Sequence, residues 1–271
     1  MIKHLITGGC SFTAWENTVS WANSLTEYLK FKNNNLTAIC TAHRGQGQDQ
    51  IQKKVMLSIL DAFDNGLIPE DILVVVMWSG TCRKSWYIDN SDILKKLATT
   101  DSLLYDLKNK KTTTGGWLTT HNSTGYLSNL KFTHDYYLID EELGGVGKVH
   151  DSLEHIIMLQ NFCKLNGVKL VHQFFMDNVF EDIEKHKEHQ IINYLYKQLD
   201  FDSIIKQGMM EYLESFLNIT KDKSRPLDYL ERINRSNGIS LFDRDGYHPG
   251  VDGVKLWSEN VLFPFLQSKN I

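Results

Sequence analysis

Two short segments near opposite ends of the chain carry residue types suited to nucleophilic chemistry. The first is GGCSFT at residues 8–13, where Ser11 follows a pair of glycines. Glycines there permit a sharp turn out of a strand, which places the serine at the mouth of a sheet with backbone N–H groups able to hold an oxyanion. The same pattern also suits a plain glycine turn in which Ser11 caps a helix.

The second segment is DRDGYHP at residues 243–249, in which Asp245 and His248 lie three positions apart. A carboxylate at this spacing can accept a hydrogen bond from one imidazole nitrogen and leave the other nitrogen free to act as a base. An ordinary Asp–His contact within a loop is the alternative. Together with Ser11, these two residues are of the types that make up a Ser-His-Asp triad.

The rest of the chain alternates between strand and helix patterns. The clearest strand is ILVVVM at 72–77, which is apolar at every position and therefore typical of a parallel strand buried on both faces. Helical periodicity is strong at 149–166, where apolar residues recur on one face. We also expect strands at 4–7, 36–41, 168–174 and 239–242, and helices at 20–30, 46–64, much of 180–217, and from a cap at Asp252 to an end or kink at Pro264.

Strands that alternate with helices predict an α/β architecture, with a parallel sheet covered by helices on both faces. In such sheets the functional residues gather beyond the carboxyl ends of the strands, so Ser11 stands at an informative position. Residues 84–147 break the alternation, because they are polar and contain a threonine run and two glycine pairs. We interpret this stretch as a cap inserted into a single domain that spans residues 1–271.

Composition and charge narrow the class of protein. Hydrophobic residues make up 42% of the chain and charged residues 23%, as in ordinary soluble globular proteins. A formal net charge of −4 lacks the basic excess of nucleic-acid binders, so we expect no nucleic-acid partner. The four cysteines are scattered, and the longest apolar run is too short to cross a bilayer. We therefore expect a cytoplasmic protein without a signal peptide or a membrane partner.

The two segments together resemble the SGNH hydrolases, also called the GDSL esterase/lipase superfamily. The first block of that family typically reads Gly-Asp-Ser, and here it reads Gly-Cys-Ser and ends at Ser11. The last block is matched closely by DGYHP at 245–249, which is followed by Asp252-Gly253 and a helix that bears Trp257. The resemblance extends over both ends of the chain and does not include the inserted stretch.

The resemblance implies a flavodoxin-like three-layer α/β/α fold with a mainly parallel sheet. It implies Ser11 as the nucleophile, His248 as the general base and Asp245 as the acid that orients the histidine. It implies no metal or other cofactor. A pair of histidines at 186 and 189 is best interpreted as part of a charged, solvated helix face, and the remaining histidines form no ligand set.

The oxyanion hole implied by the resemblance departs from the family pattern. Backbone N–H groups of Ser11 and Gly45 are expected to contribute, with Gly47 as the alternative to Gly45. The family usually supplies an asparagine after its third strand, and this chain has none there. Thr81 falls nearest that place, and a hydroxyl of Ser79 or Thr81 is the candidate replacement.

Trp78 and Arg83 resemble an arrangement found in divergent, phage-like members of the family. Arg83 is then a candidate to bind an anionic part of the substrate, with Trp78 beside it. The resemblance implies an esterase or deacetylase that acts on a small-molecule or carbohydrate ester, with an acetylated carbohydrate as the first candidate. Two alternatives stay open, namely an O-acyltransferase that uses the same triad and a non-catalytic ligand-binding protein that keeps the fold.

Overall fold

The computed structural model describes residues 1–14, 20–43, 46–81, 83–88, 116–121, 145–216, 241 and 248–271. Its centre is a four-stranded parallel sheet with the strand order β2-β1-β3-β6. This order is that of the first four strands of a flavodoxin-like sheet. The four strands are β1 (His4–Gly8), β2 (Thr37–Cys40), β3 (Ile72–Trp78) and β6 (Lys169–Phe174).

Strand β3 shows why helices pack on both faces of the sheet. All seven of its residues are buried, as its uninterrupted apolar sequence predicts. Successive side chains of a strand point to opposite faces, so β3 contributes to two hydrophobic cores. Leu73, Val75 and Met77 belong to one core, whereas Val74, Val76 and other alternate residues belong to the second.

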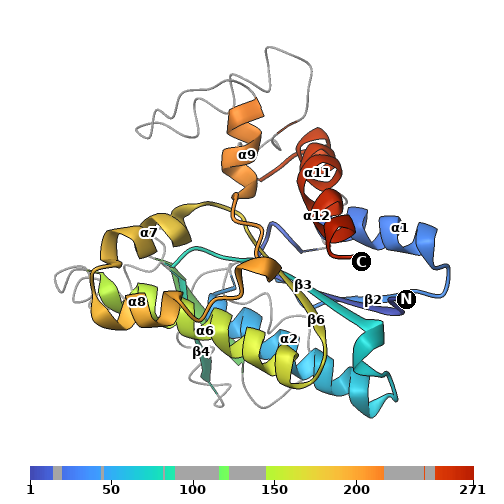
Figure 1. Ribbon diagram of the computed structural model, residues 1–271, viewed down its shortest axis with the longest axis horizontal. Helices are drawn as coiled ribbons and strands as arrows, with labels where there is room; N and C mark the ends of the chain where they lie inside the picture. Colours follow the sequence, from blue (N-terminus) through green and yellow to red (C-terminus); the bar gives the residue numbers. More distant parts are fainter. Residues whose placement is uncertain are drawn as a thin grey trace.

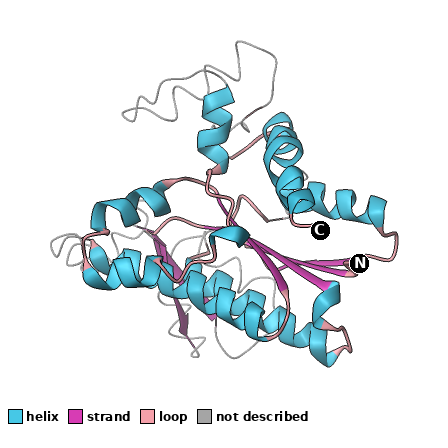
Figure 2. Cartoon of the chain, viewed as in Figure 1, coloured by secondary structure: helices cyan, strands magenta, loops and turns pink. Residues whose placement is uncertain are grey.

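Two layers of helices enclose these cores, one on each face of the sheet (Figure 1, Figure 2). The three-layer α/β/α prediction is therefore confirmed. The first layer consists of α1 (Trp21–Lys32), α9 (Met209–Phe216), α11 (Val251–Trp257) and α12 (Phe263–Ser268). The second consists of α2 (Gln48–Asp64), α6 (Val146–Leu165), α7 (Asn178–His186) and α8 (Gln190–Tyr196).

Short single-turn elements complete the main body. A 3₁₀ turn, η1 (Pro69–Asp71), leads into β3, and the carboxylate of Asp71 forms an ion pair of 2.7 Å with Lys3 just before β1. A second turn, η3 (Phe201–Ser203), follows α8. Immediately after it, Ile204 bridges to His172 in parallel fashion at the outer edge of β6.

The final helical region departs from the sequence expectation in two details. Helix α11 begins at Val251, so Asp252 lies within the first helical turn and Gly250 occupies the cap position. The chain then passes through a π-helical turn, η4 (Ser258–Leu262), before α12. Pro264 lies in the first turn of α12, where its missing N–H breaks no helical hydrogen bond of that helix. The proline therefore marks a change of helix type.

The inserted stretch contributes one two-stranded antiparallel sheet among the described residues. Its strands are β4 (Arg83–Ile88) and β5 (Gly116–His121), and β4 lies against α2. Most of 84–147 lies outside the described residues, so the interpretation of this stretch as a cap stays a prediction. The strand expected at 239–242 also lies outside them, apart from Leu241. Of the helices in the described ranges, none is both long and apolar enough to cross a bilayer.

Candidate active site

The loop after β1 places Ser11 at the carboxyl edge of the sheet. Gly9 has φ +156°, and a Cβ added to it would lie 2.9 Å from the Met77 carbonyl oxygen and overlap the Thr13 side chain. Only glycine fits between these neighbours without a shift of the backbone. The chain can therefore leave β1 and pass directly alongside β3, which brings Ser11 to the end of the two central strands.

Ser11 lies within a hydrogen-bonded turn that closes on the Cys10 carbonyl. The amides of Thr13 and Ala14 both donate to the Cys10 carbonyl, at 3.0 and 3.1 Å, and the indole N–H of Trp21 donates to the Thr13 hydroxyl at 3.1 Å. The first helix among the described residues is α1, which begins at Trp21, and its cap is Ser20, whose hydroxyl accepts from the Asn23 amide. Ser11 therefore stands in a fixed turn, and the helix-cap interpretation of this serine is not what the structure shows.

The histidine from the other end of the chain lies within hydrogen-bond distance of this serine. His248 Nε2 is 2.8 Å from Ser11 Oγ, although the two residues are 237 positions apart. Both side chains are partly exposed. A base at this distance can take the hydroxyl proton as the oxygen attacks a carbon atom, which is the geometry of an activated serine.

Two aromatic rings support the imidazole. The Phe12 ring lies 4.7 Å from the His248 ring and 4.7 Å from the Phe175 ring, measured between ring centroids, with interplanar angles of 37° and 34°. Phe12 is 4% exposed, so its ring is fixed by the core and in turn limits the tilt of the imidazole. The residue directly after Ser11 thus supports the His248 ring.

If Ser11 is a nucleophile and His248 its base, Phe12→Leu is expected to lower kcat by about tenfold while KM changes little, because a misplaced base costs rate before it costs binding. Steady-state kinetics on chains verified as folded by circular dichroism measure this. Phe263→Leu is the matched control. Phe263 begins α12 and stacks on Tyr28 of α1, so its ring also packs against another aromatic ring but does not support His248. A loss of equal size in both variants would contradict a specific role for Phe12.

The backbone around His248 is anchored to Leu241. The Gly250 amide donates to the Leu241 carbonyl at 2.9 Å. A Cβ on Gly253 would collide with that same carbonyl, so α11 approaches it more closely than any other residue type permits. Asp245 lies outside the described residues, and its role as the orienting acid stays a prediction.

The loop between β2 and α2 lies next to the serine loop. The His43 amide donates to the Gly9 carbonyl at 3.3 Å, and the Gln46 amide donates to the His43 carbonyl at 3.4 Å. Gly47 occupies the cap position of α2. Gly45 lies outside the described residues, so its contribution to an oxyanion hole also stays a prediction.

Two residues after β3, Ser79 and Thr81, carry hydroxyl groups that differ in their hydrogen bonding. Thr81 donates to the Asp182 carboxylate on α7 at 2.6 Å, which uses its only hydroxyl proton. Thr81 can serve an oxyanion through its hydroxyl only if this bond opens. Ser79 is fully buried, and its hydroxyl has no hydrogen-bond partner in the part of the chain that the structure describes.

Trp78 lies in the core. Its side chain is fully buried, and the indole N–H donates to Nδ1 of His172 at 2.9 Å. In this conformation Trp78 presents no surface to a substrate, because the ring is enclosed between β3 and the α2–α6 layer. Arg83 begins β4, and its side chain lies outside the described part of the chain.

His172 is the second buried partner of this pair. Burial lowers the pKa of His172 to about 3, so the imidazole is neutral at physiological pH. Because Nδ1 accepts from Trp78, the ring proton sits on Nε2. No described residue accepts a hydrogen bond from that nitrogen, so a positive charge on the buried ring would be costly.

Comparison with known proteins gives a weak structural likeness. No family model and no curated protein matches the chain. The crystal structure of TesA aligns with 98% of this chain and 98% of its own, at 11% identity and a TM-score of 0.42. A protein named YXIM from Bacillus subtilis aligns with 100% of this chain and 58% of its own, at 12% identity and a TM-score of 0.47.

A third structure, LAE5, is described as an α/β hydrolase enzyme from the metagenome of Lake Arreo in Spain. It aligns with 99% of this chain and 95% of its own, at 10% identity and a TM-score of 0.34. At these identities and scores the likenesses decide neither the family nor the chemistry of this chain. The chemistry rests on the local geometry around Ser11 and His248.

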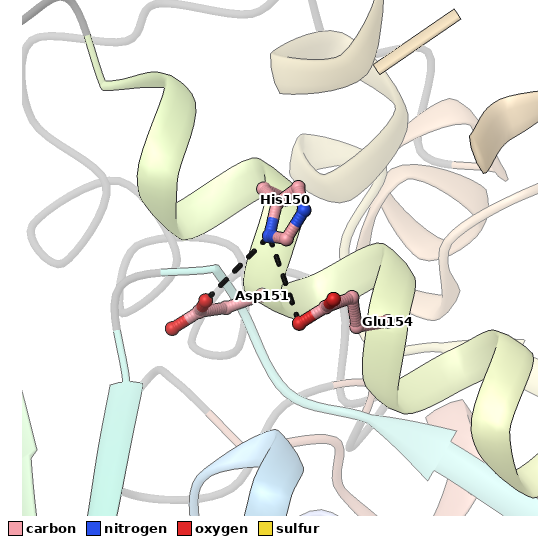
Figure 3. Close-up of side chains that lie close together, drawn as sticks. All are labelled: His150, Asp151 and Glu154. Carbon is pink, nitrogen blue, oxygen red and sulfur yellow. Dashed lines mark ion pairs between the residues drawn. The ribbon is translucent and has the colours of Figure 1, made fainter. Parts of the chain in front are cut away.

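A separate cluster of potential ligand groups lies on the first turns of α6 (Figure 3). His150 Nδ1 is 3.9 Å from the Asp151 carboxylate and 3.6 Å from that of Glu154. Within the described residues, this is the one group of three whose ligand atoms lie close enough to share an ion. All three side chains are partly open to solvent, and pairing along a helix surface accounts for their closeness, so we assign the cluster no metal.

Proposed function

We propose that this chain is a serine hydrolase that cleaves an ester through Ser11, His248 and Asp245. The observation that carries the proposal is the 2.8 Å separation of Ser11 Oγ and His248 Nε2 at the carboxyl edge of a parallel α/β sheet. This edge is where such sheets hold their reactive groups. The flanking glycine turn and the Phe12 ring fix both partners in that position.

The reaction follows from this geometry. His248 Nε2 takes the proton of Ser11 as its oxygen bonds to the acyl carbon, and the carbonyl electrons move to the carbonyl oxygen. When that oxyanion collapses, the bond to the alcohol breaks, and the alcohol leaves with the proton from His248. Water then repeats the sequence on the acyl-serine, which frees the acid and restores the hydroxyl.

Asp245 supports the base in this proposal by accepting from the other imidazole nitrogen. We propose an acetyl ester, and an acetylated carbohydrate first, as the substrate.

A fluorophosphonate probe tests the activated serine directly. We expect one adduct on the native chain by intact mass, because the serine oxygen displaces fluoride from phosphorus only when a base takes its proton. Ser11→Ala is expected to give no adduct and to lose ester turnover by at least about 10⁴-fold. Peptide mapping of the labelled chain identifies the modified residue.

Ser24→Ala is the matched control for this experiment. Ser24 lies in α1, where its hydroxyl donates to the Ser20 carbonyl, so its removal is expected to leave both the adduct and turnover unchanged. An unlabelled native chain that is folded by circular dichroism would sink the proposal. The same result would favour a ligand-binding protein that has kept only the arrangement of the side chains.

A further inference from the structure

A buried, unpartnered carboxamide lies in the loop beside the serine. Gln46 is 1% exposed, yet neither the nitrogen nor the oxygen of its side chain has a hydrogen-bond partner among the described residues. A buried polar group without a partner is costly to the fold, so it calls for an explanation. An amide that serves a reacting group explains why this cost persists.

The position of Gln46 links it to the reactive edge of the sheet. Its backbone amide bonds to the His43 carbonyl, and the His43 amide bonds to the Gly9 carbonyl, two residues before the serine. On its other side, Gln48 Nε2 donates to the Ser79 carbonyl at 2.6 Å. Gln46 therefore lies in a loop tied both to the serine turn and to the end of β3.

The neighbouring glutamines differ from Gln46 in one decisive respect. Gln48 donates its amide hydrogen to Ser79, and Gln52 donates to the sulfur of Met56. Gln173 also has a nitrogen without a partner, but it lies within β6, and its oxygen accepts from Trp257 inside the core. Within the described part of the β2–α2 loop and the first turn of α2, Gln46 is the glutamine whose side-chain nitrogen lacks a described acceptor.

Acyl transfer to Ser11 needs hydrogen-bond donors at the carbonyl oxygen. As the serine oxygen bonds to carbon, that oxygen becomes an anion, and fixed donors in a buried place stabilise it far more than they stabilise the neutral ester. A carboxamide offers two N–H donors and carries no charge of its own. The Thr81 hydroxyl is already donated to Asp182.

We infer that the Gln46 carboxamide donates to the oxyanion formed on Ser11, with the buried Ser79 hydroxyl as a second donor. This inference rests on the proposed function, since it assigns a donor to the reaction of Ser11. It makes Gln46 a catalytic residue that contributes at the transition state and contributes little to binding of the neutral substrate.

The test compares Gln46→Leu with Gln52→Leu, which removes another buried glutamine from the same region of α2. We expect Gln46→Leu to lower kcat about 10²-fold with KM changed less than about threefold, and Gln52→Leu to stay within about twofold of the native rate. The inhibition constant of a trifluoromethyl ketone, which forms an oxyanion on the serine, is expected to rise in proportion to the loss of kcat/KM. Gln46→Asn is expected to recover part of the rate.

The thermal stability of the Gln46 variants distinguishes a role in the reaction from a role in holding the fold together. Because the Gln46 side chain makes no hydrogen bond to the residues that the structure describes, Gln46→Leu is expected to have a Tm no lower than the native chain. If that variant does not fold, Gln46→Glu keeps the shape of the side chain and is expected to lose still more rate, because a carboxylate repels the oxyanion.

Two outcomes would overturn the inference. One is a native chain labelled at Ser11 together with a Gln46→Leu variant whose kcat matches that of Gln52→Leu. The other is a complex with the trifluoromethyl ketone in which water, and not Gln46 Nε2, lies within hydrogen-bond distance of the oxyanion. A native chain that takes no fluorophosphonate label would instead overturn the proposed function itself.

Discussion

His248→Gln is expected to reduce ester turnover by about 10⁴-fold or more. The substitution removes the nitrogen that lies 2.8 Å from Ser11 Oγ, and a glutamine amide cannot accept and return a proton at neutral pH. The serine would keep its position in the turn, since its backbone hydrogen bonds do not involve residue 248. Turnover of p-nitrophenyl acetate and the rate of fluorophosphonate labelling both measure the effect.

His4→Gln is the matched control for this loss. His4 begins β1 at the opposite end of the strand, where its Nδ1 lies 2.6 Å from the Thr37 hydroxyl. The control is expected to keep turnover within about twofold of the native chain. If His248→Gln labels at the native rate while His4→Gln does too, a base other than His248 activates the serine, and the proposed mechanism fails.

The second large effect concerns stability against acid. His172 is fully buried, and burial lowers its pKa to about 3 from an ordinary value of 6.5. The unfolded chain therefore binds a proton at His172 between these two pH values, whereas the folded chain does not. Stability from this residue is complete above about pH 6.5 and is lost as the pH falls toward 3. One pKa unit corresponds to about 1.4 kcal/mol, so roughly 3 kcal/mol is lost by pH 4.

His172→Gln isolates this contribution. A glutamine oxygen can still accept from the Trp78 indole N–H, as His172 Nδ1 does, but the amide does not titrate. Urea unfolding at pH 7 and at pH 4 is expected to show a smaller decrease in the free energy of unfolding for the variant than for the native chain. Equal decreases in both would show that protonation of His172 does not drive acid unfolding.

The sequence predicts the sheet from simple rules, whereas the expectation that Ser11 and His248 meet comes from the resemblance to the SGNH hydrolases. An apolar run such as 72–77 has to be buried on both faces, and this requirement alone implies two helix layers. The carboxyl-edge rule then places Ser11 at the reactive end of the sheet. Their 2.8 Å separation is what only the three-dimensional structure supplies.

Other features depend on tertiary packing and leave little trace in the sequence. The stretch QGQDQIQ at 46–52 resembles a solvated helix start, yet its glutamines are buried. A possible signal is the recurrence of uncharged glutamine at alternate positions, because a solvated face usually carries Lys and Glu instead. Trp78 shows the opposite case, since the resemblance makes it a candidate substrate contact and its side chain here fills the core. The β4–β5 pairing arises within a polar stretch that has no strong strand pattern.

Ser11 and His248 are 237 positions apart, so they meet only when the first and last segments of the described chain pack together. Lys32 Nζ bonds to the carbonyl of Ile271, and Gln267 bonds to the Tyr28 hydroxyl, so the last helix is fastened to the first. The segment that bears His248 leads directly into this final helical region. A local opening that undocks the last helices would therefore carry the base away while leaving the serine turn intact. The proposed hydrolysis would then require the last helices to be docked, and it could be lost while the sheet stays folded.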